Sequence, residues 1–187
     1  DLRRLNRIMG NNRRWRRVFR DFFPTPNQAP KLLIELGAGD GMSTLEILRP
    51  LSTGRWSGSV RRLLFIDLNN PVTPETVQAF AEINWQVECI QSDAVAWMHA
   101  NPEALAESDL IFANLFLHHF EARRLQDFLQ PIQRHARRFH ALEPRRSRLA
   151  LFLSSRVGWI GCNSVTQNDA PVSVIAGFKD QELSEIW

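Results

Sequence analysis

Residues 32–41 have the sequence LLIELGAGDG, an apolar run followed by a glycine-rich turn, and this stretch decides the fold. The apolar run predicts a buried strand, and the glycines allow the backbone to turn sharply and to approach a ligand closely. A dinucleotide-binding loop of the form G-x-G-x-x-G needs its third glycine at position 42, which is Met42. The third glycine is Gly41 instead, and this spacing disfavours a nicotinamide cofactor.

Strand-like and helix-like segments alternate on both sides of this turn. Apolar β-type runs predict strands at residues 31–36, 62–67, 85–90, 109–114 and 139–142. Helical spacing and capping signals predict helices at residues 42–51, 73–81, 95–99 and 121–130. Pro131 is expected to end or kink the last of these helices. This order predicts the α/β class, with a Rossmann-like, doubly wound parallel sheet that carries helices on both faces.

The length and composition fit one compact domain outside the membrane. The chain has 187 residues, of which 44% are hydrophobic and 23% are charged. No apolar run approaches the ~20 residues of a membrane-spanning helix, and the arginine-rich start lacks the apolar stretch of a signal peptide. Two cysteines, Cys89 and Cys162, cannot form a disulfide framework. A reducing, cytoplasmic setting is therefore expected.

Four motifs at strand ends together resemble those of the class I S-adenosylmethionine-dependent methyltransferases. They are LLIELGAGDG at 32–41, LLFID at 63–67, QSDA at 91–94 and LIFANLFLHHF at 110–120. The resemblance covers roughly residues 31–187. It is closest to the small-molecule branch related to quinone biosynthesis, through HHF at 118–120 and FHALEPRRS at 139–147.

The resemblance also predicts how the chain ends. Members of the family usually add an antiparallel β-hairpin after the helix that DQELSEIW, residues 180–187, would form. The chain stops at Trp187 without that hairpin. We therefore expect the methyltransferase domain to be truncated at its C-terminus.

The resemblance implies S-adenosylmethionine as the cofactor and a set of residues that would hold it. The glycine loop would approach its methionine part, Asp67 would bind the ribose hydroxyls, and Asp93 with Ala94 would contact the adenine edge. Glu35 and Asp40 would bring carboxylates near the cationic end of the ligand. The complete set of predicted cofactor residues is Glu35, Gly37, Gly39, Gly41, Asp67, Asp93, Ala94 and Asn114.

Each of these residues also has a purely structural interpretation. The glycines could form an ordinary strand-to-helix turn, and Asp67 could cap a helix or serve a nicotinamide cofactor equally well. Asp93 precedes a predicted helix, where aspartate is a common N-cap, and Glu35 could cap the end of its strand. Asn114 faces the glycine loop across the predicted sheet. It is not followed by the two prolines and the aromatic residue with which nucleobase methyltransferases clamp an amine, so a nucleobase acceptor is disfavoured.

His118 and His119 are the candidate general bases, because an imidazole can take a proton from a phenol or an enol near neutral pH. Tyrosine is absent, and the only lysines are Lys31 and Lys179. His119 fits the family's turn histidine better than His118, although both could merely cap a helix or bond to the backbone. Three residues after the last strand could line the acceptor pocket or form an exposed basic turn: Glu143, Arg145 and Arg146. No pattern of metal ligands accompanies the histidines, so no metal is expected.

Residues 1–30 are predicted to form a basic, amphipathic helical arm, separate from the domain at 31–187. Residues 1–23 hold eight arginines and two aspartates, whereas the rest of the chain has a small net negative charge. Apolar residues recur at helical spacing in two groups that Asn11 and Asn12 are expected to separate: Leu5, Ile8 and Met9, then Trp15, Val18, Phe19 and Phe22. The first interpretation is a lid over the cofactor and the acceptor. Contact of residues 1–23 with an anionic membrane comes second, and RNA binding third.

Two function classes follow. The leading one is an enzyme that transfers a methyl group from S-adenosylmethionine to an oxygen or carbon of a small-molecule acceptor, aromatic or lipid-like. Its main task would be to align donor and acceptor, with one base at most. The alternative is a noncatalytic or RNA-directed module that keeps the methyltransferase fold and uses the arginine-rich arm for binding.

Overall fold

The computed structural model describes residues 10–56, 58–69, 71–147, 150, 151, 154, 171–179 and 181–186. A five-stranded sheet forms the centre of the described part, in the order β3-β2-β1-β4-β5. The strands are β1 (Leu32–Leu36), β2 (Arg61–Asp67), β3 (Trp85–Gln91), β4 (Leu110–Asn114) and β5 (Phe139–Leu142). All four pairings are parallel, so the predicted doubly wound parallel sheet is confirmed.

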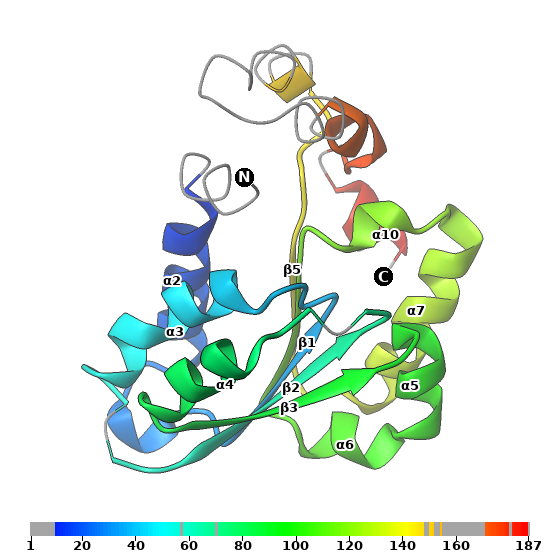
Figure 1. Cartoon of the computed structure of the whole chain (residues 1–187). Coiled ribbons are helices and arrows are strands. Elements are labelled where there is room, and N and C mark those ends of the chain that lie inside the picture. The colour runs from blue at the N-terminus through cyan, green and yellow to red at the C-terminus, as the bar shows by residue number, and fades with distance from the viewer. Residues whose placement is uncertain are drawn as a thin grey trace.

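Helices cover both faces of this sheet (Figure 1). One face carries α2 (Asn11–Phe22), α3 (Met42–Ser52) and α4 (Pro74–Ala81), and the other carries α5 (Ala94–Ala100), α6 (Pro102–Glu107) and α7 (Ala122–His135). Side chains of β1 alternate between the two cores, with Leu33 in the first and both Ile34 and Leu36 in the second. Every residue of β1 is therefore buried, which explains its continuous apolar sequence.

The predicted helices are present, and two details differ from the prediction. Helix α7 does not end at Pro131 but continues to His135. Phe128, Leu129 and Ile132 are fully buried against the sheet, and this burial outweighs the hydrogen bond that proline cannot donate. Helix α6 was not predicted, because its six residues are too few to show a periodicity.

The arm shares its core with the rest of the domain. Helix α2 begins at Asn11, where a break between two helices was predicted; the first of these, in residues 1–9, lies outside the described residues. Trp15 and Phe19 are fully buried together with residues of β1, α3 and β4. The chain thus shows no separation at residue 30, although the role of a lid stays a prediction.

The described C-terminal part is short. Helix α10 (Glu182–Ile186) forms inside the stretch where a helix was predicted. Among the residues that the structure describes, no helix combines the length and the apolar character needed to cross a membrane.

Candidate cofactor and acceptor site

The order in which strands are added to the sheet reverses between β1 and β4. From β1 it moves outward to β2 and β3, and it then returns to place β4 on the other side of β1. In open parallel sheets, ligands bind beside the carboxyl ends of the two strands that flank such a switch point. The residues that follow β1 and β4 are therefore the ones that can form a site.

The glycine loop after β1 requires its glycines. Gly37, Gly39 and Gly41 all have left-handed backbone conformations, with φ angles of 72°, 55° and 69°. A Cβ on Gly37 would lie 2.1 Å from the Phe116 ring, and one on Gly41 would lie 2.8 Å from the Phe65 ring. A Cβ on Gly39 would meet nothing within 4 Å. The middle of the loop is therefore open to a ligand, while its two ends are fixed by packing.

Asp67, the last residue of β2, holds this loop in place. Its Oδ2 accepts a hydrogen bond of 2.9 Å from the Gly39 N–H, and its Oδ1 accepts one of 3.0 Å from the Asn69 N–H. The carboxylate thus lies beside the open part of the loop, as the prediction requires. The contact of Asp67 with ribose hydroxyls stays a prediction.

Glu35 lies beneath the loop with only 2% of its surface exposed. Burial raises the pKa of its carboxyl to about 8, the hydrogen bond from Thr44 opposes this, and the charges of Asp67 and Asp40 add to it. The Thr44 hydroxyl donates to Glu35 Oε2 over 2.6 Å. Glu35 therefore keeps its proton at neutral pH, and a cation bound nearby would favour its ionised form.

Asn114, at the end of β4, is tied to helix α2. Its Oδ1 accepts a hydrogen bond of 2.9 Å from the Trp15 Nε1–H. The Trp15 ring also packs edge-on against Phe112 of the same strand, with 5.3 Å between the ring centroids. The arm is thereby fastened to the switch point itself, and the contact of Asn114 with a cofactor stays a prediction.

Asp93 has the structural role that the sequence allowed. Its Oδ1 accepts a 3.0 Å hydrogen bond from the Ala96 N–H and caps helix α5, which starts at the buried Ala94. Its Oδ2 accepts a 2.6 Å hydrogen bond from Arg124. The cap interpretation is confirmed, and the adenine contact of these residues stays a prediction.

A turn after β4 is clamped by one carboxylate. Leu115 has a left-handed φ of 56°, which is strained for a leucine. Glu143 Oε1 accepts hydrogen bonds from the N–H groups of the next two residues, Phe116 at 2.9 Å and Leu117 at 2.8 Å. Glu143 Oε2 accepts a 3.3 Å bond from the His118 N–H and lies 2.8 Å from His118 Nδ1. Glu143 therefore holds the turn and orients an imidazole.

The two histidines differ in their surroundings. The side chains of His118 and Glu143 are both only 5% exposed. His119 is more exposed than His118 but is still partly covered, and its ring centroid lies 4.2 Å from that of His118. Partial burial lowers the pKa of His119, the neighbouring His118 lowers it further, and Glu143 opposes both. Of the two imidazoles, His118 is the one that a carboxylate orients, whereas sequence reasoning favoured His119.

Arg145 and Arg146 form the exposed turn that was one of their two interpretations. Arg146 Nη2 donates to both carboxylate oxygens of Glu182, at 2.7 and 2.6 Å, and so ties the turn to α10. Arg145 forms an isolated β-bridge with Phe178. Within the described ranges, no three His, Cys, Asp or Glu side chains gather closely enough to hold a metal ion.

Besides the hydrogen bonds of Glu143, three further contacts of the site were not predicted from the sequence. They are the bond from Thr44 to Glu35, the bond from Trp15 to Asn114, and the packing of Phe116 on Gly37. Helical spacing does indicate that Trp15 lies on a buried face, but not which strand it meets. Thr44 and Phe116 carry no sequence signal that would single them out.

Comparison with known proteins identifies the fold. No protein-family profile and no curated protein matches the sequence. The plantazolicin methyltransferase BpumL, solved in complex with SAH, superposes with a TM-score of 0.59 at 14% identity and covers 97% of this chain. The plantazolicin methyltransferase BamL, solved in complex with a triazolic desmethylPZN analog and SAH, superposes with a TM-score of 0.60 at 14% identity and covers 98% of this chain. An O-methyltransferase family protein from Burkholderia thailandensis superposes with a TM-score of 0.59 at 16% identity and covers 99% of this chain.

The chain has the fold of S-adenosylmethionine-dependent methyltransferases. It spans 64%, 63% and 50% of the lengths of these three proteins, respectively. The methyltransferase fold predicted from the four strand-end motifs is thereby confirmed. The closer likeness to the quinone-related branch stays a prediction.

Proposed function

We propose that the chain binds S-adenosylmethionine where β1 and β4 end, and transfers its methyl group to an oxygen or carbon of a small, aromatic or lipid-like acceptor. The observation that carries this proposal is the bond from the Gly39 N–H to Asp67, inside a loop of three left-handed glycines at the switch point. An acidic side chain beside an open stretch of backbone suits a ligand that carries both ribose hydroxyls and an extended charged chain. The SAH-bound structures with the same fold support this choice.

The charges of the predicted site residues would suit the cofactor, which carries a positive sulfonium and an ammonium group. The loop of Gly37, Gly39 and Gly41 would receive the methionine part, and Asp67 would bind the ribose hydroxyls. The buried carboxyl of Glu35 would lose its proton to match the added positive charge. Asp93, Ala94 and Asn114 would complete the binding residues. When bound, the cofactor supplies an electrophilic methyl group whose carbon–sulfur bond breaks with its electron pair passing to sulfur.

His118 would act as the base wherever the acceptor must lose a proton. Glu143 Oε2 lies 2.8 Å from His118 Nδ1, which favours the tautomer with the proton on Nδ1 and leaves Nε2 as the acceptor nitrogen. The Nε2 atom would take the acceptor's proton while the acceptor's electron pair forms the new bond to the methyl carbon. The Glu143 carboxylate would then stabilise the imidazolium.

Methyl transfer is tested with labelled S-adenosylmethionine and a panel of phenols, quinols and fatty-acyl acceptors. We expect label in the product of at least one acceptor, and none when the acceptor is omitted. The His118→Asn variant serves as the matched control for the base. The proposal fails if no member of the panel is labelled by a protein that binds the cofactor tightly, because the fold would then serve binding alone.

A further inference from the structure

Helix α2 has two faces of opposite character. Its aromatic face is buried in the core, where Trp15 and Phe19 are 0% exposed and the following Phe23 is 2% exposed. Both Trp15 and Phe19 pack edge-on against Phe112 of β4. These rings are therefore not available for insertion into a bilayer or for stacking on bases.

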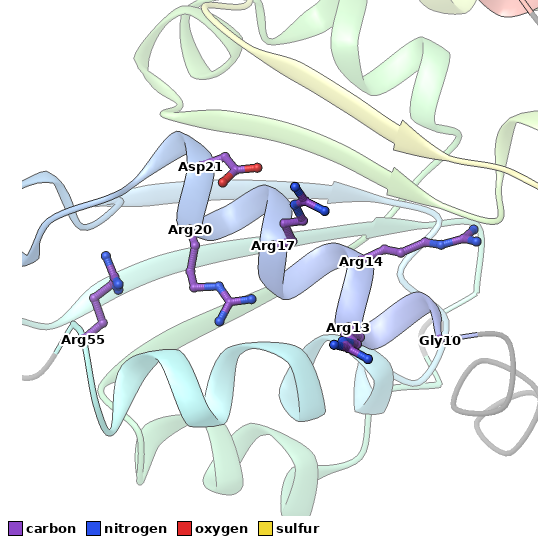
Figure 2. A pocket seen from close by; sticks show the side chains of 7 residues that line it. All are labelled: Gly10, Arg13, Arg14, Arg17, Arg20, Asp21 and Arg55. Carbon is purple, nitrogen blue, oxygen red and sulfur yellow. The ribbon is translucent and has the colours of Figure 1, made fainter.

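The opposite face of α2 is covered by arginines. Arg13, Arg14, Arg17 and Arg20 are all exposed, and their side chains extend from α2 in several directions (Figure 2). Together with Arg55 from the connection between α3 and β2, they line an open groove of about 760 Å³. We call this surface the arginine groove; Gly10 and Asp21 complete its lining.

The positive charge of the arginine groove is balanced only in small part by negative charge. Five arginines and one aspartate give it a formal charge of +4, although the whole chain has a net charge of only +3. Within the part of the chain that the structure describes, no carboxylate forms a salt bridge with an arginine of the α2 face. Arg55 donates to the backbone carbonyl of Pro24. The groove is therefore a concentrated source of positive potential on one side of the molecule.

We propose that the arginine groove docks the protein on an anionic membrane surface through charge alone. Lipid headgroup phosphates need only cations as partners, and guanidinium groups bind phosphate with two parallel hydrogen bonds. Among the described residues, those that line the groove include no aromatic residue, whereas surfaces for single-stranded nucleic acid usually combine cations with aromatic stacking platforms. The groove therefore fits a bilayer better than RNA.

Docking through the arginine groove would also position the proposed methyltransferase site. Trp15, on the reverse side of the same helix, donates to Asn114 at the edge of the proposed methyltransferase site. Docking through α2 would thus hold that site close to the membrane surface, where a lipid-like acceptor is found. The docking itself does not depend on methyl transfer, so the two proposals can fail separately.

Vesicle sedimentation tests the docking with the full chain and without any cofactor. The probes are vesicles of phosphatidylcholine with 30% phosphatidylglycerol and vesicles of phosphatidylcholine alone. We expect binding to the anionic vesicles only, with release when NaCl is raised from roughly 50 to 500 mM, because screening shortens the reach of surface charges. Equal binding to both vesicles, or no binding to the anionic ones at low salt, would overturn the proposal.

Charge reversal locates the binding surface. The variant Arg13→Glu/Arg17→Glu should lower the partition coefficient about thirtyfold or more, that is ~2 kcal/mol at ~1 kcal/mol for each basic residue near the membrane. Its matched control is Arg123→Glu/Arg134→Glu, which makes the same charge change on exposed residues of α7, across the sheet. The control should bind at least ten times more tightly than the groove variant.

Two results would contradict the proposal, one from the comparison of the variants and one from a competition with RNA. Equal losses in the groove variant and the α7 control would assign the binding to net charge rather than to the groove. Single-stranded RNA that displaces the protein from vesicles at equal phosphate concentration would assign the groove to nucleic acid. Thermal unfolding of both variants checks that the exposed substitutions leave the fold intact.

Discussion

The candidate cofactor site and the arginine groove are both charged, but their charged groups are held in different ways. At the cofactor site, Glu35, Asp67 and Glu143 are each bonded to a neighbouring group, and Glu35 is almost fully buried. In the groove, four exposed arginines lie on helix α2, and the exposed Arg55 lies on the connection between α3 and β2. A fixed arrangement selects the shape of a ligand, whereas exposed charges attract any anionic surface and are screened by salt. Substitutions in the two regions should therefore have separable effects.

The largest effect is expected from Gly37→Ala in the glycine loop. The new Cβ would lie 2.1 Å from the Phe116 ring, in a backbone with φ near 72°. We expect a loss of at least ~3 kcal/mol in stability, from overpacking together with backbone strain, and no measurable cofactor binding. Denaturant unfolding and calorimetry measure the two effects.

Gly10→Ala is the matched control for this substitution. Gly10 has almost the same φ, 71°, but its Cβ would meet nothing within 4 Å. The control should lose only the strain energy, about 1 kcal/mol, and bind the cofactor normally. Equal losses in both variants would show that the packing of Phe116 on the loop does not matter.

The second-largest effect is expected on turnover, and it distinguishes the two histidines. Its measurement requires an acceptor that the protein methylates. His118→Asn should lower turnover by roughly 10²-fold or more, and His119→Asn by less than about fivefold, with unchanged cofactor affinity in both. Glu143 orients only the imidazole of His118 through its ring nitrogen. Steady-state kinetics across pH measures this. The opposite order would return the role of the base to His119, as the sequence favoured, and equal turnover in both variants would make the histidines structural.

The third effect concerns the pH dependence of stability. Burial raises the pKa of Glu35 to about 8, so between about pH 4.5 and 8 the folded state holds a proton that the unfolded state has released. This proton makes stability fall as pH rises through that window, by about 1.4 kcal/mol per pH unit, and the effect ends above pH 8. Glu35→Gln should remove this slope in denaturant titrations between pH 5 and 8. An identical slope in the variant would show that Glu35 ionises normally.

The smallest effect is expected at the bond that links the two regions. Trp15→Phe removes the donor to Asn114 Oδ1 and keeps an aromatic ring on the core face of α2. We expect a loss of ~1 to 2 kcal/mol in stability, a modest loss of cofactor affinity, and unchanged binding to anionic vesicles. A double-mutant cycle with Asn114→Ala isolates the pair. Additive losses would show that the bond contributes nothing of its own.

Sequence reasoning recovered the fold because its signals were local. An apolar run ending in glycines, repeated strand-to-helix alternation and the caps at Thr73 and Asp93 each depend on neighbouring residues only. Of the two outcomes expected at Pro131, an end of the helix is wrong for a non-local reason, since burial of α7 on the sheet outweighs the lost hydrogen bond.

The candidate site was recovered in part for the same reason. The strand-end residues Gly39 and Asp67 meet, as parallel strand ends must. The role of Glu143 was missed because its partners lie 25 to 27 residues earlier, in a strained turn that no pattern announces. The aromatic spacing of α2 predicted an apolar face correctly, but not that this face belongs to the core.

Titration calorimetry with S-adenosylmethionine and its demethylated product tests the central claim most directly. The account predicts binding of both ligands and no binding of nicotinamide dinucleotides. Asp67→Ala should weaken the binding by ~1.5 to 3 kcal/mol through the loss of charge-assisted hydrogen bonds, and Asp21→Ala, which removes an exposed carboxylate from the arginine groove, should leave it unchanged. Absence of heat and of any thermal shift at millimolar ligand, or selective binding of a nicotinamide dinucleotide, would contradict the account.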